Sequence, residues 1–180
     1  PSVAVQAEKA TNIVVETDVL RVEISRQGGA LVTAELLEYP LSKDAPDVPV
    51  QLLTQQSENF YVIESGLVDA KQGGPTHITP LNSSANRYVL ADGQNEINVP
   101  LRWSADGVTV TKTYVFRRGS YEIDLNYGVE NQSEALWRGL NYLQIRRAYN
   151  PPERSMFNVD SYSFVGPVFY DSDSYDKLDP

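Results

Sequence analysis

The sequence predicts an all-β fold, a twisted antiparallel β-sandwich, on two observations. Residues 86–131 contain four runs in which apolar and polar side chains alternate, and a period of two puts all apolar side chains on one face of a strand. One buried and one solvated face is typical of antiparallel sheets. The turns agree, because Asp92-Gly93 and Asp106-Gly107 suit tight hairpins and Arg117–Ser120 makes a third reversal. We therefore expect these runs to form an antiparallel meander.

Two of the runs specify which side chains are buried. Asn95–Trp103 and Tyr121–Glu130 alternate over their whole length. Burial of a large apolar side chain stabilises a fold by ~1.5–3 kcal/mol, and truncation of one, such as Leu125, to Ala should cost ~2–5 kcal/mol. The side chains that we predict to be buried are Ile97, Val99, Leu101, Ile123, Leu125 and Val129.

The N-terminal half adds shorter strands. Residues 1–12 are small and polar, as in a linker, and residues 13–180 form the predicted domain. Alternating or apolar runs predict strands at residues 20–25, 30–37, 50–54 and 60–64. Two stretches between and after these strands predict loops instead. One contains Pro40, Pro46 and Pro49, which cannot donate to a strand ladder.

The other predicted loop is residues 66–85, a long stretch rich in Gly, Pro, Thr, Asn and Ser. After the meander, the apolar residues of Ala135–Arg147 fit either a helical or a period-two pattern. The strands around this segment favour a strand. Asn150-Pro151-Pro152 ends it, and the aromatic-rich Phe157–Tyr170 predicts one more strand or an ordered loop.

Composition excludes several classes of protein. The chain has 180 residues, a net charge of −9 and no cysteine. The negative charge argues against nucleic acid and anionic membrane surfaces as partners, because both bind basic patches. Without cysteine, the chain has neither a disulfide nor a thiol nucleophile. No apolar run reaches the ~18 residues that a membrane span needs. The chain begins at Pro1 rather than Met, so we expect it to be a piece of a longer protein.

The sequence assigns no catalytic, cofactor-binding or metal-binding residue. His77 is the only histidine and lies in a proline-flanked stretch, where we expect a surface imidazole without a partner. We therefore predict that His77→Ala leaves fold and function intact. Without cysteine and with one histidine, only carboxylate-bound ions such as calcium remain. Asp171-Ser172-Asp173 is too weak a signal for such a site, and the last aspartates are expected to form a solvated tail.

The carboxylates and the aromatic residues raise two further possibilities for function, glycoside chemistry and sugar binding. Paired carboxylates can perform glycoside chemistry, but those of the predicted strands fall on the polar faces, where they keep a sheet soluble. These residues are Glu96, Glu122, Asp124 and Glu130. The 11 tyrosines together with Trp103 and Trp137 are compatible with a sugar-stacking platform, although tyrosine is also an ordinary sheet residue.

Several blocks of the sequence resemble a known family. Thr17–Leu20 and Gln27–Gly29 are similar to the start of the large periplasmic domain of the membrane protein insertase YidC of Gram-negative bacteria. Tyr88–Glu96 and Thr111–Gly119 resemble its middle, and Tyr121–Asn131 continues the match. The blocks occur in the same order as in the family.

The resemblance implies a galactose-mutarotase-like β-supersandwich between the first and second membrane helices of an insertase and chaperone. Such a protein helps to insert and fold proteins of the bacterial inner membrane, alone or with the Sec translocon, and this domain lies on the periplasmic face. The family's domain is longer than this chain. The sandwich is therefore expected to be incomplete at its C-terminal end, without its last strands and a closing helix.

Three functions remain open from the sequence. The first is a non-catalytic contact module of the insertase, whose implied partners are the Sec translocon, its SecDF accessory complex and the inserting membrane proteins. The second is a sugar- or peptide-binding module, and the third an aldose-epimerase-like enzyme, which needs a histidine acid and a carboxylate base facing one sugar. A dispersed charge of −9 predicts no direct lipid binding. Unpaired strand edges and Tyr162–Asp179 are the expected contact surfaces, unless the latter packs against the rest of the domain.

Overall fold

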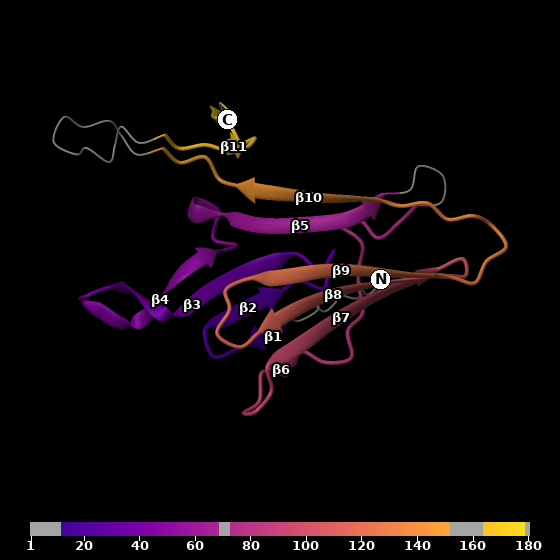
Figure 1. The fold of residues 1–180 in the computed structure, drawn as a ribbon, viewed down its shortest axis with the longest axis horizontal. Coiled ribbons are helices and arrows are strands. Elements are labelled where there is room, and N and C mark those ends of the chain that lie inside the picture. Colours follow the sequence, from indigo (N-terminus) through magenta and orange to yellow (C-terminus); the bar gives the residue numbers. More distant parts are fainter. Residues whose placement is uncertain (1–11, 69–72, 152–163, 179–180) are drawn as a thin grey trace, which may run out of the picture.

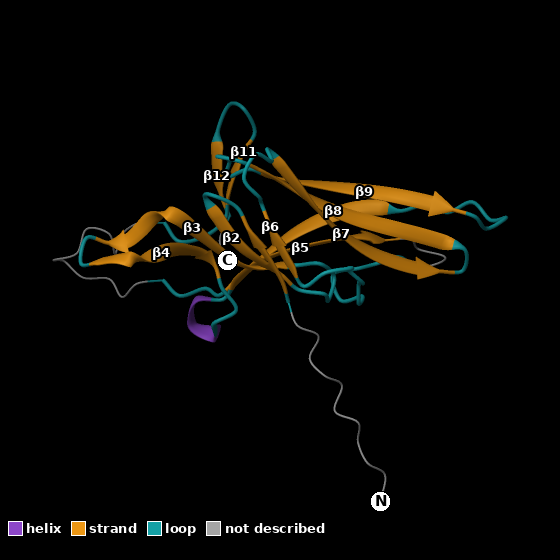
Figure 2. Ribbon diagram, turned by 90° about the horizontal axis from the view of Figure 1, so that it is seen from below, coloured by secondary structure: helices purple, strands orange, loops and turns teal. Residues whose placement is uncertain are grey.

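The computed structural model describes residues 12–68, 73–151 and 164–178. The predicted linker, apart from Asn12, lies outside the described residues, as does the first part of Phe157–Tyr170. The described residues are almost entirely strands and loops, with a single short 3-10 turn at Ser57–Asn59 (Figure 2). The all-β prediction is confirmed.

Seven strands form the larger sheet, in the order β10-β5-β3-β2-β1-β6, with β4 paired to β3. All of its strand pairs are antiparallel except β1 with β6. Its strands are β1 (Ile13–Glu16), β2 (Leu20–Ile24), β3 (Leu31–Ser42), β4 (Ala45–Leu53), β5 (Tyr61–Val68), β6 (Arg87–Val89) and β10 (Leu140–Arg147).

The smaller sheet has three antiparallel strands in the order β7-β8-β9. They are β7 (Glu96–Ala105), β8 (Val108–Arg117) and β9 (Ile123–Asn131). In Figure 1 these three long strands pass across β1 and β2 of the larger sheet. A separate short hairpin, β11 (Val168–Tyr170) with β12 (Tyr175–Lys177), lies beyond the end of β10.

The β7–β8 hairpin has the turn that the sequence predicts. Asp106 and Gly107 have φ angles of 49° and 77°, and two positive φ values give the local twist that matches paired strands. Gly119, also at positive φ (67°), helps the chain to reverse between β8 and β9. Three of the four predicted runs therefore form the expected meander.

The fourth run corrects the prediction. β6 does not form a hairpin with β7 through Asp92-Gly93 but pairs with β1 in parallel, Val14 to Arg87 and Glu16 to Val89. Its backbone finds partners in the larger sheet, and the next residue, Leu90, donates its N–H to the Glu16 carbonyl. Residues 90–95 then cross between the sheets. Alternation predicted the strand correctly but could not specify the partner.

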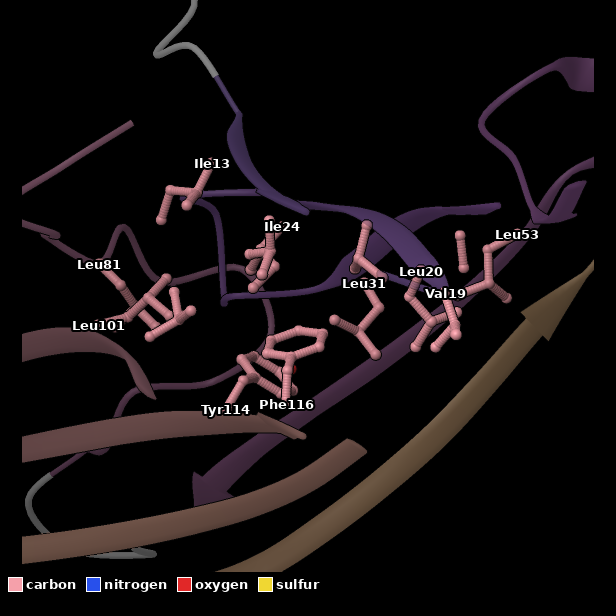
Figure 3. Packing of buried hydrophobic residues seen from close by; sticks show 14 residues of the cluster. Ile13, Val19, Leu20, Ile24, Leu31, Leu53, Leu81, Leu101, Tyr114 and Phe116 are labelled. Carbon is pink, nitrogen blue, oxygen red and sulfur yellow. The ribbon is translucent and has the colours of Figure 1, made fainter. Parts of the chain in front are cut away.

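The main core lies between the two sheets. Figure 3 shows Tyr114 and Phe116 of β8 pointing toward Ile24 and Leu31 of the larger sheet, with Leu101 beside them. The fully buried aliphatic residues of this cluster come from both sheets: Ile13, Val15, Val22, Ile24, Val99 and Leu101. The fold is therefore a two-sheet sandwich.

The predicted core residues fall into three groups. Val99 and Leu101 are both 0% exposed, as expected. Ile97, Ile123 and Leu125 pack against the cluster but are only partly buried. The prediction for Val129 is wrong, because this side chain is 43% exposed. Val129 is near the end of β9, an edge strand of the smaller sheet, where the side chain is covered only in part.

Strands replace parts of both predicted loops. β3 and β4 continue through the proline-rich segment as a long hairpin arm, residues 37–50, in which Pro40 lies opposite Pro49. Bulges interrupt its register, which accommodates the missing proline N–H groups because both strands are edges there. The second predicted loop is partly strand, since β5 extends to Val68. β10, Leu140–Arg147, confirms the strand prediction for the second part of Ala135–Arg147.

The difference in burial between two aliphatic side chains gives a stability prediction. Leu101→Ala should lower the free energy of unfolding by about 2–5 kcal/mol, because it leaves a cavity in the closed part of the core. Val129→Ala should change it by less than about 1 kcal/mol, since the side chain is half solvated. Urea titrations followed by circular dichroism measure both values. Equal losses for the two variants would contradict the assignment of the core.

Candidate functional site

A buried lysine lies at the centre of the sandwich. Every second residue of β8 faces the larger sheet, and Lys112 occupies one of these positions with 2% exposure. Its amine donates hydrogen bonds to the carbonyls of Gly28 (2.8 Å), Gly29 (3.0 Å) and Ser65 (3.3 Å). Three carbonyls match the three donors of an ammonium group. The side chain thus connects β8 to two separate segments of the larger sheet.

Two tyrosines surround this amine. The rings of Tyr114 and Tyr127 have centroids 5.3 and 5.9 Å from Nζ, within the range of cation–π attraction. The Tyr114 hydroxyl donates to the Gly29 carbonyl at 2.6 Å, and the Tyr127 hydroxyl is 2.9 Å from Ser65 Oγ. Burial lowers the pKa of Lys112 to about 7 and raises the pKa of Tyr114. This arrangement is buried between the two sheets and connects them. We call Lys112, its three carbonyl acceptors and the two tyrosines the clamp.

A polar pocket lies on the opposite, outer face of the larger sheet. Side chains alternate along β5, so that Glu64 and Val62 point outward while Ile63 packs into the main core. The pocket has a volume of about 200 Å³. Its polar lining comes from Ser25, Gln27, Gln55, Glu64, His77 and Arg146, and its apolar lining from Ala30, Val32, Phe60, Val62 and Ile78.

Glu64 is fixed within this pocket by residues of β10. One carboxylate oxygen accepts from Gln144 Nε2 at 2.6 Å, and the other from Arg146 Nη1 at 3.1 Å. Glu64 is only 7% exposed, so the pairing with Arg146 compensates a buried negative charge. The Arg146 guanidinium also lies over the Phe60 ring, 5.3 Å from its centroid. Together they form a rigid, charge-neutral wall.

His77 has a partner, which corrects the expectation of an isolated surface imidazole. Its Nδ1 is 2.7 Å from the Tyr142 hydroxyl, and its backbone N–H donates to the same oxygen at 2.9 Å. Since the hydroxyl accepts the backbone N–H, its single proton is available for Nδ1. We therefore assign the tautomer with the proton on Nε2. The ring also contacts Tyr142 edge to face, with centroids 5.9 Å apart.

Two glycines make room for this contact. A Cβ on Gly66 would lie 2.8 Å from the Tyr142 hydroxyl and 2.9 Å from the Pro75 carbonyl oxygen. Gly28, at a φ of 65°, would bring a Cβ to within 2.0 Å of the His77 carbonyl oxygen. Its N–H donates to the Thr79 carbonyl. The segment that carries His77 is thus packed tightly against the turn between β2 and β3.

The two tryptophans considered as a sugar platform line a second cavity. Trp103 and Trp137 contribute to a space of about 360 Å³ beside the β7–β8 turn, together with Asp106 and Ser133. The rings also pack against a small core cluster of Leu67, Val108 and Val110. Part of their surface is therefore used for packing, and Trp137 Nε1 is buried without a hydrogen-bond partner among the described residues.

The strand carboxylates lie where the sequence predicts. Glu96 and Asp124 form ion pairs with Arg117, at 3.5 and 2.5 Å, on the outer side of the smaller sheet. Glu130 is exposed on β9, and Glu122 is exposed just before that strand begins at Ile123. Within the described residues, no group of three or more His, Cys, Asp and Glu side chains is placed to hold a metal ion.

Asp171, Asp173 and Asp176 are exposed, as expected of a solvated segment, and they belong to the β11–β12 hairpin. The Asp171 carboxylate accepts the backbone N–H groups of Asp173 (3.1 Å) and Ser174 (3.0 Å), and these bonds lower its pKa. Asp171 therefore shapes the β11–β12 turn. Asp176 belongs to β12, and Asp179 lies outside the described residues.

Sequence reasoning missed the two best-defined polar clusters. The alternation of β8 does place Lys112 in register with Val110 and Tyr114, and this break in an apolar series was the available signal. No comparable signal marks Glu64 or Tyr142, because their partners are 80 and 65 residues away along the chain.

The fold defines a two-sheet β-sandwich domain with a polar pocket on the outer face of the larger sheet and a second cavity beside the β7–β8 turn. A family model described as the YidC periplasmic domain matches residues 12–179. The chain belongs to this family. No helix among the described residues is long and apolar enough to cross a membrane.

Curated relatives agree with the family. The chain is 43% identical over 173 residues to the membrane protein insertase YidC of Methylococcus capsulatus, covering 95% of this chain and 31% of that protein. For the protein of the same name from Thioalkalivibrio sulfidiphilus the identity is 42% over 172 residues, with 91% and 30% covered. For that of Coxiella burnetii it is 43% over 176 residues, with 95% and 31% covered. The chain thus spans about a third of the length of these relatives.

The clamp gives a prediction on pH dependence. Unfolded Lys112 has the ordinary pKa of 10.5, whereas the folded value is about 7. Between these values the unfolded chain binds a proton that the folded chain lacks, so stability rises with pH through this window and is flat below it. Urea titrations of wild type should show this rise, and Lys112→Met should lose it. Lys43→Met, in the exposed tip of the β3–β4 arm, should retain it. Parallel curves for wild type and Lys112→Met would contradict the assignment.

The Tyr142 hydroxyl gives a second prediction. Tyr142→Phe removes the acceptor of the His77 N–H and the donor to Nδ1, and should lower the free energy of unfolding by about 1–3 kcal/mol. Tyr149→Phe is the control, because Tyr149 is 56% exposed and should lose less than about 0.5 kcal/mol. Chemical denaturation measures both. A Tyr142→Phe variant as stable as the control would rule out a structural role for this contact.

Proposed function

We propose that this chain is a non-catalytic periplasmic module of a membrane protein insertase and chaperone, acting as a contact surface while inner-membrane proteins are inserted and folded. The membership of the YidC periplasmic domain family carries this proposal. The intact protein works alone or with the Sec translocon and its SecDF accessory complex, which are the proposed partners together with the inserting proteins.

The C-terminal hairpin supports a protein contact. The rings of Tyr170 and Tyr175 stack with centroids 4.6 Å apart, and they are 56% and 72% exposed. Phe169 on the same hairpin is 60% exposed. Adjacent exposed aromatics are typical of interaction surfaces, where large rigid rings bury much area at low entropic cost.

Charge favours protein over lipid as the neighbour. The chain carries a net charge of −9, and anionic lipid surfaces attract basic segments instead. The β11–β12 hairpin itself adds Asp171, Asp173 and Asp176 around its aromatic pair. We therefore place the partner contact on a protein surface that complements acidic and aromatic side chains.

The polar pocket supports binding better than proton transfer. An aldose-epimerase mechanism needs a free carboxylate base and a histidine acid, and the pocket does contain Glu64 and His77. Both oxygens of Glu64, however, already accept hydrogen bonds from Gln144 and Arg146, so this carboxylate is held in an ion pair and is not free to act as a base. His77 has its Nδ1 occupied by Tyr142. These contacts favour the non-catalytic assignment.

Site-specific photo-crosslinking in the intact insertase tests the contact surface. Crosslinkers at Tyr170 and at Tyr175 should give adducts with Sec or SecDF components. A crosslinker at Asp92, in the turn after β6 on the other side of the molecule (Figure 1), is the control and should give none. Adducts confined to the insertase itself would instead show that the hairpin packs against the remainder of its own protein.

A further inference from the structure

We propose that the polar pocket on the outer face of the larger sheet binds a single neutral polyhydroxylated ring, such as one sugar unit. This inference goes beyond the contact function, which we place on the C-terminal hairpin and not in this pocket. It rests on the charge balance of the pocket, the pairing of its donors and acceptors, its size and its rigidity.

Charge balance selects a neutral ligand. Among the described residues that line the pocket, the acidic side chain is Glu64 and the guanidinium is that of Arg146, and the two are paired with each other at 3.1 Å. An anionic ligand would have to displace Glu64 from Arg146, and a cationic ligand would have to displace Arg146. Either exchange leaves one buried charge uncompensated, which is costly.

The arrangement of donors and acceptors selects hydroxyl groups. Each Glu64 oxygen accepts one hydrogen bond and retains further acceptor capacity. Next to it, the guanidinium of Arg146, which is 58% exposed, keeps donors that face solvent. A hydroxyl accepts and donates through one oxygen, so it can bridge a guanidinium and a carboxylate that are already paired. A peptide group has its donor and its acceptor on separate atoms and fits this pair less well.

The rest of the lining suits a sugar ring. Gln27 and Gln55 each bring an amide, which both donates and accepts. Between the polar groups lie Val32 and Val62, which form a small buried cluster with Phe60 against them. This apolar floor matches the C–H face of a ring. The volume of about 200 Å³ is below the ~300 Å³ at which drug-sized pockets begin, which restricts the ligand to one unit.

The pocket is formed before any ligand enters. His77 is held by Tyr142 through two hydrogen bonds, which leaves its Nε2–H as a donor of fixed orientation. Glu64 is fixed by Gln144 and Arg146. Binding therefore orders few side chains, which reduces its entropic cost.

Protein-detected NMR on the 180-residue chain tests the proposal. Titration with D-glucose and with myo-inositol should give saturable shifts of backbone amides at residues 25–27, 60–64 and 146. Dissociation constants in the millimolar range are expected for ligands of this size. D-glucuronate, which has the same ring with a carboxylate, and N-acetylglycinamide, which offers peptide groups, should bind at least about fivefold more weakly.

Two exposed amides provide the variants. Gln27→Ala and Gln55→Ala should each weaken binding about fivefold, the loss of one ordinary hydrogen bond, with an unchanged spectrum elsewhere. Gln94→Ala, a matched change in the turn before β7 and outside the pocket lining, should bind like wild type.

Other outcomes overturn the proposal. These are the absence of saturable shifts for both polyols, tighter binding of the peptide analogue, equal binding by Gln27→Ala, and shifts confined to the indole signals of Trp103 and Trp137. The last result would place the ligand in the second cavity. None of these outcomes changes the expected crosslinks of Tyr170 and Tyr175, so the two proposals fail independently.

Discussion

The requirement to satisfy one buried amine constrains how the two sheets of the sandwich meet. Lys112 extends from the middle of β8 into the space between the sheets, and its donors are used by carbonyls from the β2–β3 turn and from β5. A buried polar group of this kind is tolerated only with hydrogen-bond partners. The two sheets therefore have to meet in one relative position, because a shift of β8 by one residue would remove the amine from its acceptors. Gly29 contributes by leaving space, since a Cβ there would lie 3.2 Å from Lys112 Cδ.

This constraint also links the interior to the outer pocket. The turn whose carbonyls bind Lys112 includes Gly28, which lies against the His77 segment on the other side. β5 provides Ser65 to the interior and Glu64 to the outer face. Neighbouring residues thus serve both polar clusters. The position of the pocket wall depends on the same backbone that the clamp holds.

The sequence predicted the fold well where pairing is local. A period of two together with tight turns specified β7, β8 and β9 and their order, because each strand pairs with the next one along the chain. It failed where the partner is distant. β6 has the same alternating character but pairs with β1, more than seventy residues earlier, and the prolines of the arm lie in paired edge strands. The burial of Val129 was mispredicted because alternation shows on which face of the sheet a side chain lies but not whether other residues pack over it. The clusters around Glu64 and His77 depend on β10, so only the three-dimensional structure brings them together.

The β3–β4 arm has a further consequence for how the domain behaves at high concentration. The β3–β4 arm projects from the body (Figure 2), and its Leu41 and Val48 are exposed. Such an arm would ordinarily be a template on which a second molecule adds its own strand. Pro40 and Pro49 lie opposite each other, and Pro46 follows on the same hairpin. Each lacks the N–H that a growing intermolecular sheet requires. The arm therefore remains an extended, partly apolar surface that resists fibre-like self-association, and a neighbouring protein would recognise it through its side chains rather than its backbone.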